Sequence, residues 1–260
     1  MRRVRPIGHD DRLSIVEHLD ELRSRLLFSG LAFLVAWAFT GWQNHAVLEI
    51  LNKPLPDELA EPITLSPPEA FYTTLTTAAY AGILLALPVI LYQLYAFILP
   101  AFSSRERKVA FPLLLLIPFL FIAGVAFCYF VVLTPAMEFL LSFNSDEFQN
   151  EVRAKDYYSF VMLLLLAMGI GFQIPVGVLT ACRLGVTSAA QLRRFRRYAI
   201  VGVFVLAALL PTIDPLTLIL EAIPLYALYE LSILLAGWFG KPADEASEEM
   251  AAEAPTEEDD

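Results

Sequence analysis

The apolar residues of the chain are gathered into long blocks, and this grouping constrains the fold more than any other feature of the sequence. A helix needs about 20 mostly apolar residues to cross the hydrocarbon core of a bilayer. Hydrophobic residues make up 57% of the chain and charged residues only 18%, which is more apolar than soluble domains usually are. The sequence therefore predicts an all-α integral membrane protein with six transmembrane helices, at residues 26–42, 71–99, 109–133, 157–182, 198–210 and 216–238.

The fifth of these helices is short. At about 1.5 Å per residue, residues 198–210 extend over about 20 Å, whereas the hydrocarbon core is about 30 Å thick. We therefore expect this helix to reach only part of the way across the bilayer.

Two polar motifs are typical of helix starts. Ser66-Pro67-Pro68-Glu69 combines a capping box with Pro at the first helical position, and it precedes the block at residues 71–99. Asp214 followed by Pro215 predicts an N-cap for the last helix.

Basic residues are unevenly divided between the connecting segments. All but three of the 18 Lys and Arg residues fall on one side of the predicted membrane, and the exceptions are Lys53, Arg153 and Lys155. Basic residues are retained on the cytoplasmic side. We therefore expect a multi-pass protein of the cytoplasmic (inner) membrane with both termini in the cytoplasm.

The chain is expected to have one structured domain between two loose ends. Residues 1–13 form a flexible cytoplasmic N-terminus, residues 14–240 form the six-helix membrane domain, and residues 241–260 form an acidic, disordered cytoplasmic tail. The formal charge of −10 is concentrated in that tail. The acidity therefore says little about ligands, and nothing indicates a nucleic-acid partner.

Enzyme motifs are missing from the sequence. It has neither the HExxH metal motif nor the GxSxG nucleophile motif. The three histidines, His9, His18 and His45, lie in or near the first connecting segments and none lies in the middle of a predicted span. We expect no catalytic residues, metal site or cofactor.

Two acids, Glu21 and Glu106, lie close to the ends of predicted spans on the basic side. One interpretation is local pairing, in which Glu21 contacts Arg25 one turn further along the helix and Glu106 contacts its basic neighbours. The other interpretation is functional, because a carboxylate can accept a forked, directional pair of hydrogen bonds from a ligand's guanidinium.

Four polar side chains fall within or beside the predicted membrane helices. Ionisable groups in a membrane are costly and are candidate functional residues, but they can also fix helix packing by hydrogen bonding. Glu221 and Glu230 are nine residues apart, so they point to nearly opposite helix faces and are not expected to form one site. The four candidates are Gln173, Asp214, Glu221 and Glu230.

The sequence resembles the TatC family, the multispanning receptor of the twin-arginine protein translocase. The opening HLDELRSRL at residues 18–26 is similar to the HLxELRxRL motif of that family. Further similar blocks follow in the same order, from about residue 14 to residue 240. They are SPPEAF, PVILYQ, AFILP, the pair Glu106-Arg107, SFVM, IPV, the segment 194–198 and IPLYALYE.

The resemblance implies a cup of six helices, the last two of them short, and a non-enzymatic receptor at the cytoplasmic face. It implies recognition of the paired arginines in signal peptides of folded cargo proteins, and transport driven by the proton-motive force. Implied partners are TatA-like and TatB-like single-span subunits, further copies of the chain and the lipid bilayer. Glu21 and Glu106 match the signal-binding acids, and the positions around them are Arg23, Phe97, Pro100 and Arg107.

The chain departs from the family pattern at several polar positions. Gln173 stands where the family often has Glu, and Gln cannot titrate, which argues against a proton-carrying role. Thr76 replaces a common Lys, Leu218 replaces a usual polar residue, and Glu221 is an additional acid. A small secondary transporter or channel that uses Gln173, Asp214 and Glu221 is the alternative function, and an intramembrane hydrolase is a third class without a catalytic pair.

Overall fold

The chain forms a bundle of helices. In the computed structural model, the backbone is described for residues 15–56, 59, 61–98, 104–148, 151–208 and 214–239, and side chains for these except 15–17, 104–113 and 239. The described residues form no strand beyond one isolated bridge. The helical elements are α1 (Ile15–Trp42), α2 (Asn44–Asn52), α3 (Glu69–Ile98), α4 (Ser104–Phe127), the π-helix η3 (Cys128–Leu133), α5 (Thr134–Ser142), α6 (Ala154–Gly171), α7 (Ile174–Arg183), α8 (Ala189–Arg194), α9 (Arg196–Ala208) and α10 (Pro215–Phe239).

Five helical segments are long and apolar enough to cross a membrane, which confirms the predicted class of all-α membrane protein. The block at residues 198–210 corresponds to α9, whose described part has 13 residues and is not among the five. Its partial crossing as a sixth helix stays a prediction. The five segments are His18–Trp42, Glu69–Ile98, Leu114–Ser142, Ala154–Arg183 and Pro215–Trp238.

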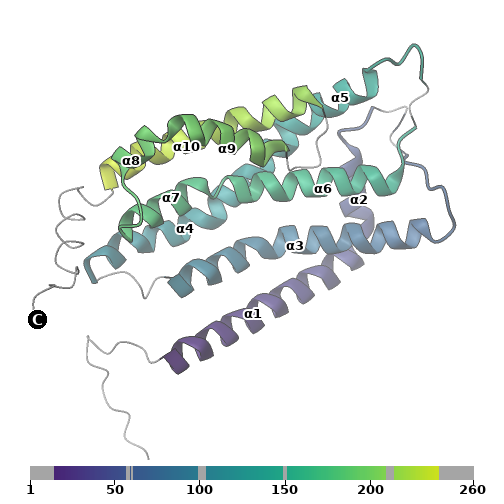
Figure 1. Ribbon diagram of the computed structural model, residues 1–260. Coiled ribbons are helices and arrows are strands. Elements are labelled where there is room, and N and C mark those ends of the chain that lie inside the picture. Colours follow the sequence, from purple (N-terminus) through teal and green to yellow (C-terminus); the bar gives the residue numbers. More distant parts are fainter. Residues whose placement is uncertain are drawn as a thin grey trace, which may run out of the picture.

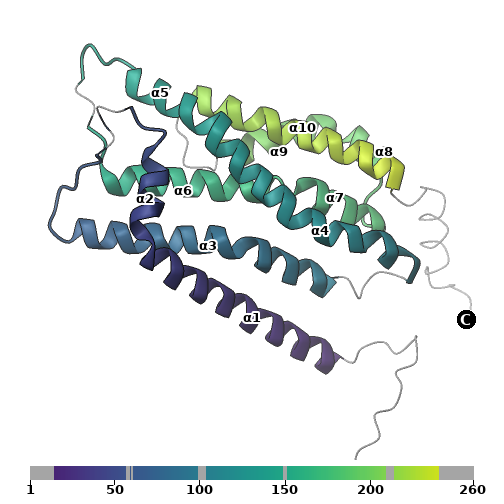
Figure 2. The same cartoon turned by 180° about the vertical axis from the view of Figure 1, so that it is seen from behind.

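The two opposite views agree on the order of the helices across the bundle (Figures 1 and 2). α1 packs along α3, α3 packs against α4 and α6, and α10 packs against α7 and α9. The end of the bundle where α1 and α4 begin and α3 ends is called the N-terminal end here. α2 and the segments that lead into α3 and α6 lie at the opposite end.

The core is centred on α6 and η3. In the most apolar stretch of the span formed by α6 and α7, 56% of the residues are buried inside the protein. The corresponding share in α1 is 6%. α6 is therefore surrounded by protein, whereas α1 exposes most of its apolar surface, as a helix at the lipid boundary does. The fully buried core side chains include Cys128, Val132, Leu133, Val161, Leu164 and Met168.

α1 and α3 approach each other so closely that their backbones touch. A Cβ atom added at Gly82 of α3 would lie 2.8 Å from Cα of Trp37. Close to this point, Thr40 Oγ1 donates a hydrogen bond of 2.7 Å to the carbonyl of Ala78. Small residues allow this type of close helix packing in membranes, where van der Waals contact and hydrogen bonds replace the hydrophobic effect.

Several helices differ in extent from the predicted blocks. The third block continues past residue 133 through η3 and α5 to Ser142, with Pro135 in the first turn of α5, where a missing N–H is tolerated. The fourth block is interrupted at Phe172 and Gln173, between α6 and α7. α2 lies between the first two predicted blocks, where the sequence predicts no membrane span.

Tyrosine hydroxyls hold the C-terminal end of α2 on the core. Tyr129 donates a hydrogen bond of 2.6 Å to the carbonyl of Ile50, and Tyr157 donates to the carbonyl of Leu51. The last carbonyls of a helix have no partner within the helix. These side chains therefore satisfy two of them while they attach α2 to η3 and α6.

We expect Tyr157→Phe to lower the free energy of unfolding by about 1–3 kcal/mol, because it leaves a buried carbonyl without its donor. Equilibrium unfolding in mixed detergent micelles would measure the change. The matched control is Tyr72→Phe, which removes a hydroxyl from a side chain that is 62% exposed and should change stability by less than about 0.5 kcal/mol. Equal losses in the two variants would contradict the role given to Tyr157.

An ion pair joins the starts of α3 and α6, at the end of the bundle opposite the N-terminal end. Arg153 Nε lies 2.7 Å from Glu69 Oε1, and the Glu69 side chain is almost fully buried. The hydrogen bond to Glu69 raises the pKa of the Arg153 guanidinium above its ordinary value. Beside this pair, the N–H of Ile63 bonds to the carbonyl of Val152 at 2.8 Å.

The Ser66–Glu69 motif folds as a turn at the start of α3, with the N–H of Glu69 bonded to the carbonyl of Ser66 at 3.0 Å. The Glu69 carboxylate accepts from the N–H of Leu65 at 2.9 Å as well as from Arg153. The motif thus lies at the start of α3 as predicted, but the predicted cap is wrong in detail: the helix begins at Glu69, after both prolines, and the acid bonds to Leu65 and to a distant arginine.

Candidate functional site

Glu21 lies in the second turn of α1, near the N-terminal end of the bundle. Arg25, one turn further along, donates from Nε at 2.9 Å and from Nη2 at 2.6 Å, and both hydrogen bonds go to Oε1 of Glu21. The other carboxylate oxygen, Oε2, lies 3.8 Å from Nδ1 of His18. The local pairing of Glu21 with Arg25 that the spacing indicates is therefore confirmed, and it uses only one of the two oxygens.

Side chains of α3 complete this arrangement. Arg25 Nη1 donates a hydrogen bond of 2.9 Å to Oε1 of Gln93. The ring of His18 stacks on the ring of Phe97, with centroids 4.3 Å apart and planes inclined by 14°. We refer to His18, Glu21, Arg25, Gln93 and Phe97 as the α1–α3 cluster.

The structure adds His18, Arg25 and Gln93 to the residues that the sequence singled out. The signal for Gln93 was present, since it is an amide inside an otherwise apolar block. For Arg25, the sequence predicts only the contact with Glu21. Its contact with Gln93 joins residues that are 68 positions apart, and spacing along one helix does not predict such a contact.

The remaining residues of the predicted site are described in less detail. Glu106 and Arg107 lie in the first turn of α4, with side chains outside the described residues. Pro100 also lies outside them, and Arg23 is exposed on α1. Glu21 lies on α1 and Glu106 on α4, and both helices begin at the same end of the bundle (Figures 1 and 2).

The polar residues within or beside the membrane helices make contacts in the interior of the bundle. Gln173 lies at the break between α6 and α7 and donates to the carbonyl of Ile117 on α4 at 3.3 Å. It lines a cavity of about 340 Å³ with mostly apolar walls between α3, α4 and α7. Asp214 Oδ1 accepts from the N–H of Thr217 at 2.7 Å, which confirms the predicted N-cap of α10.

The two acids of α10 have different surroundings, as their spacing predicts. Glu221 is fully buried in the core. Glu230 is 30% exposed and pairs with Arg196 of α9 at 2.7 Å, and it accepts from the hydroxyl of Tyr226 at 2.8 Å. The two acids therefore differ in exposure and in partners, and they do not form one site.

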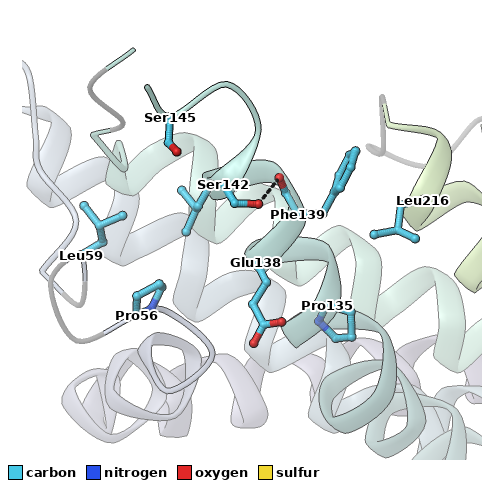
Figure 3. A pocket seen from close by; sticks show the side chains of 9 residues that line it. Pro56, Leu59, Pro135, Glu138, Phe139, Ser142, Ser145 and Leu216 are labelled. Carbon is cyan, nitrogen blue, oxygen red and sulfur yellow. Dashed lines mark hydrogen bonds between the residues drawn. The ribbon is translucent and has the colours of Figure 1, made fainter. Parts of the chain in front are cut away.

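A pocket of about 630 Å³ lies at the opposite end of the bundle, between α5, the segment after α2 and the start of α10 (Figure 3). Glu138 is the one ionisable side chain among its described lining residues. No group of three or more His, Cys, Asp or Glu side chains in the described ranges could hold a metal ion. The α1–α3 cluster is therefore the best candidate for recognition of a charged ligand.

Comparison with known proteins identifies the family. The family model described as Sec-independent protein translocase protein (TatC) matches residues 17–224. The chain belongs to the TatC family. TatC of Escherichia coli K12 is 34% identical, over 88% of this chain and 90% of the relative, and that of Aquifex aeolicus is 39% identical, over 86% and 94%.

The fold comparison agrees with this family. The crystal structure described as Twin Arginine Translocase Receptor- TatC superposes with a TM-score of 0.74 at 40% identity, and the match covers 85% of this chain and 99% of that one. The resemblance read from the sequence is confirmed. The chain is a multi-pass membrane protein and a non-enzymatic subunit of the Sec-independent protein translocase, which works as a complex with other subunits.

Proposed function

We propose that this TatC family member is the receptor that binds Arg-Arg signal peptides of folded proteins at the cytoplasmic face of the inner membrane. Both of its termini lie in the cytoplasm. Its partners are TatA-like and TatB-like single-span subunits and further copies of the chain, and the assembled complex uses the proton-motive force. The binding residues are Glu21, Glu106, Arg23, Phe97, Pro100 and Arg107.

The observation that supports this proposal most strongly is the arrangement of Glu21. Its side chain is 26% exposed and one of its carboxylate oxygens accepts from a guanidinium in the structure, so the group is suited to guanidinium ligands. A carboxylate accepts an arginine through forked, charge-assisted hydrogen bonds that a lysine cannot reproduce. With Glu106 on a helix that begins at the same end, one acid is available for each of two adjacent arginines.

The polar residues in the membrane helices belong to the same proposal as candidates for partner docking. Glu230 is partly exposed and can be reached from outside the bundle. Gln173 borders a cavity. Asp214 and Glu221 are buried, and they act on a partner only through the position of α10.

Photo-crosslinking tests the location of the site. A photoreactive residue at Ser24, which is exposed one turn from Glu21, or at Ser104 in the first turn of α4, is expected to crosslink to an Arg-Arg signal peptide. The matched control is Ser145, exposed at the opposite end, which should give no crosslink. A peptide with paired lysines should crosslink weakly at every position. Stronger crosslinking at Ser145 than at Ser24 would refute the proposal.

A further inference from the structure

The carboxylate of Glu21 already has a guanidinium bound to it. Arg25 directs both Nε and Nη2 to Oε1 of Glu21, at 2.9 and 2.6 Å. Hydrogen bonds between two charged groups at such distances belong to the stronger class. An incoming guanidinium therefore meets a carboxylate whose first oxygen is engaged and whose second oxygen faces His18 at 3.8 Å.

Gln93 of α3 also binds Arg25, so a second helix supports the contact between Arg25 and Glu21. Its amide oxygen accepts from Nη1 of Arg25 at 2.9 Å, so the guanidinium is shared between a charged acceptor on α1 and a neutral acceptor on α3. A single exposed pair one turn apart is weak and exchanges readily with water. The second acceptor holds Arg25 beside Glu21, and both members of the pair are only about a quarter exposed, at 25% and 26%.

We propose that Arg25 is an internal competitor for the signal peptide's arginine, an inference that rests on the proposed receptor function. In the free receptor, Arg25 occupies Glu21 with the support of Gln93. A signal arginine binds Glu21 when Arg25 leaves it, and one guanidinium is exchanged for another. The Glu21 charge is therefore never left unpaired near the membrane, where an uncompensated charge is costly.

The competition has a quantitative consequence for affinity. When only a fraction of the receptor is competent to bind, the apparent dissociation constant equals the intrinsic constant divided by that fraction. Arg25 therefore weakens every ligand of Glu21 by the same factor. Arg-Arg peptides form forked contacts and still bind after this loss of affinity. Lys-Lys peptides lose the same factor and no longer bind at the same peptide concentration.

Titration with labelled Arg-Arg and Lys-Lys signal peptides tests the proposal on the purified full-length receptor in lipid nanodiscs. Arg25→Gln is expected to tighten the binding of both peptides about tenfold and to leave the ratio of their dissociation constants unchanged. Gln93→Leu keeps Arg25 and removes its support, so it should tighten both about threefold. The double variant should bind as Arg25→Gln does, because the two residues act through one contact.

Two further variants distinguish the proposed competition from a general effect of charge and from a misassigned site. Arg194→Gln removes an exposed positive charge from α8 and should tighten binding by less than about twofold, since distant charges are screened. Glu21→Gln should abolish most binding, and if it binds like the unaltered protein then the receptor site itself is misassigned. Weaker binding by Arg25→Gln, or a gain restricted to one peptide, would overturn the competition. Should Arg25→Gln fail to fold, unchanged or weaker binding by Gln93→Leu would overturn it equally.

Discussion

Replacing Glu21 with Gln is expected to weaken the binding of an Arg-Arg signal peptide about 100-fold while the protein stays folded in the membrane. Truncating or neutralising one partner of a hydrogen-bonded charge pair costs about 2–5 kcal/mol of binding, and about 1.4 kcal/mol corresponds to a factor of ten. Gln has the size of Glu and can still accept hydrogen bonds from Arg25. The loss therefore reports the charge of the side chain and not its shape.

The same substitution at Glu106 should have an effect of similar size, because each acid is proposed to bind one of two adjacent arginines. Peptide titration on the purified receptor, together with export of a folded reporter in cells, would measure both variants. The matched control is Asp20→Asn, which removes an equal charge from the exposed position next to Glu21. A loss in Asp20→Asn as large as in Glu21→Gln would mean that the surface attracts the peptide only by its overall charge.

Features that depend on neighbouring residues in the chain could be predicted from the sequence. The N-cap at Asp214 follows from the chemistry of one side chain and the proline after it. The contact between Glu21 and Arg25 follows from helical spacing.

Features that join distant parts of the chain could not be predicted in this way. The sequence predicts that Glu69 forms a local cap, but its strongest partner is Arg153, which lies 84 positions away. α2 lies between the first two predicted spans, and it is held in place by tyrosines of η3 and α6. Such pairs depend on how the helices pack, and tertiary contacts of this kind override local propensity.

Substituting Gly82 with Leu is expected to separate α1 from α3 and to destabilise the protein by about 3 kcal/mol, the upper end of the usual cost of overpacking. Even a Cβ atom at this position would lie 2.8 Å from Cα and 2.9 Å from the backbone nitrogen of Trp37. These are backbone atoms, so no change of rotamer relieves the contact. Gly82→Ala should cost about 1–2 kcal/mol, because its better helix propensity offsets part of the strain.

Gly30→Leu is the matched control, since it adds the same side chain to α1 at an exposed position where a Cβ atom meets nothing within 4 Å. It should change stability by less than about 0.5 kcal/mol, as measured by unfolding in mixed detergent micelles. A loss in Gly30→Leu equal to that in Gly82→Leu would show that apolar bulk in a membrane helix is harmful anywhere.

The contact at Gly82 also positions the α1–α3 cluster, because the two helices run antiparallel and touch again where Arg25 meets Gln93. Arg25 lies about 18 Å along α1 from Trp37, at about 1.5 Å per residue. A change in the crossing of the helices at Gly82 is therefore carried to Glu21 and its partners. We expect Gly82→Ala to weaken Arg-Arg peptide binding about tenfold even under conditions where it is fully folded, since small misplacements at a binding site have large effects. Unaltered affinity in folded Gly82→Ala would mean that the cluster forms independently of this helix contact.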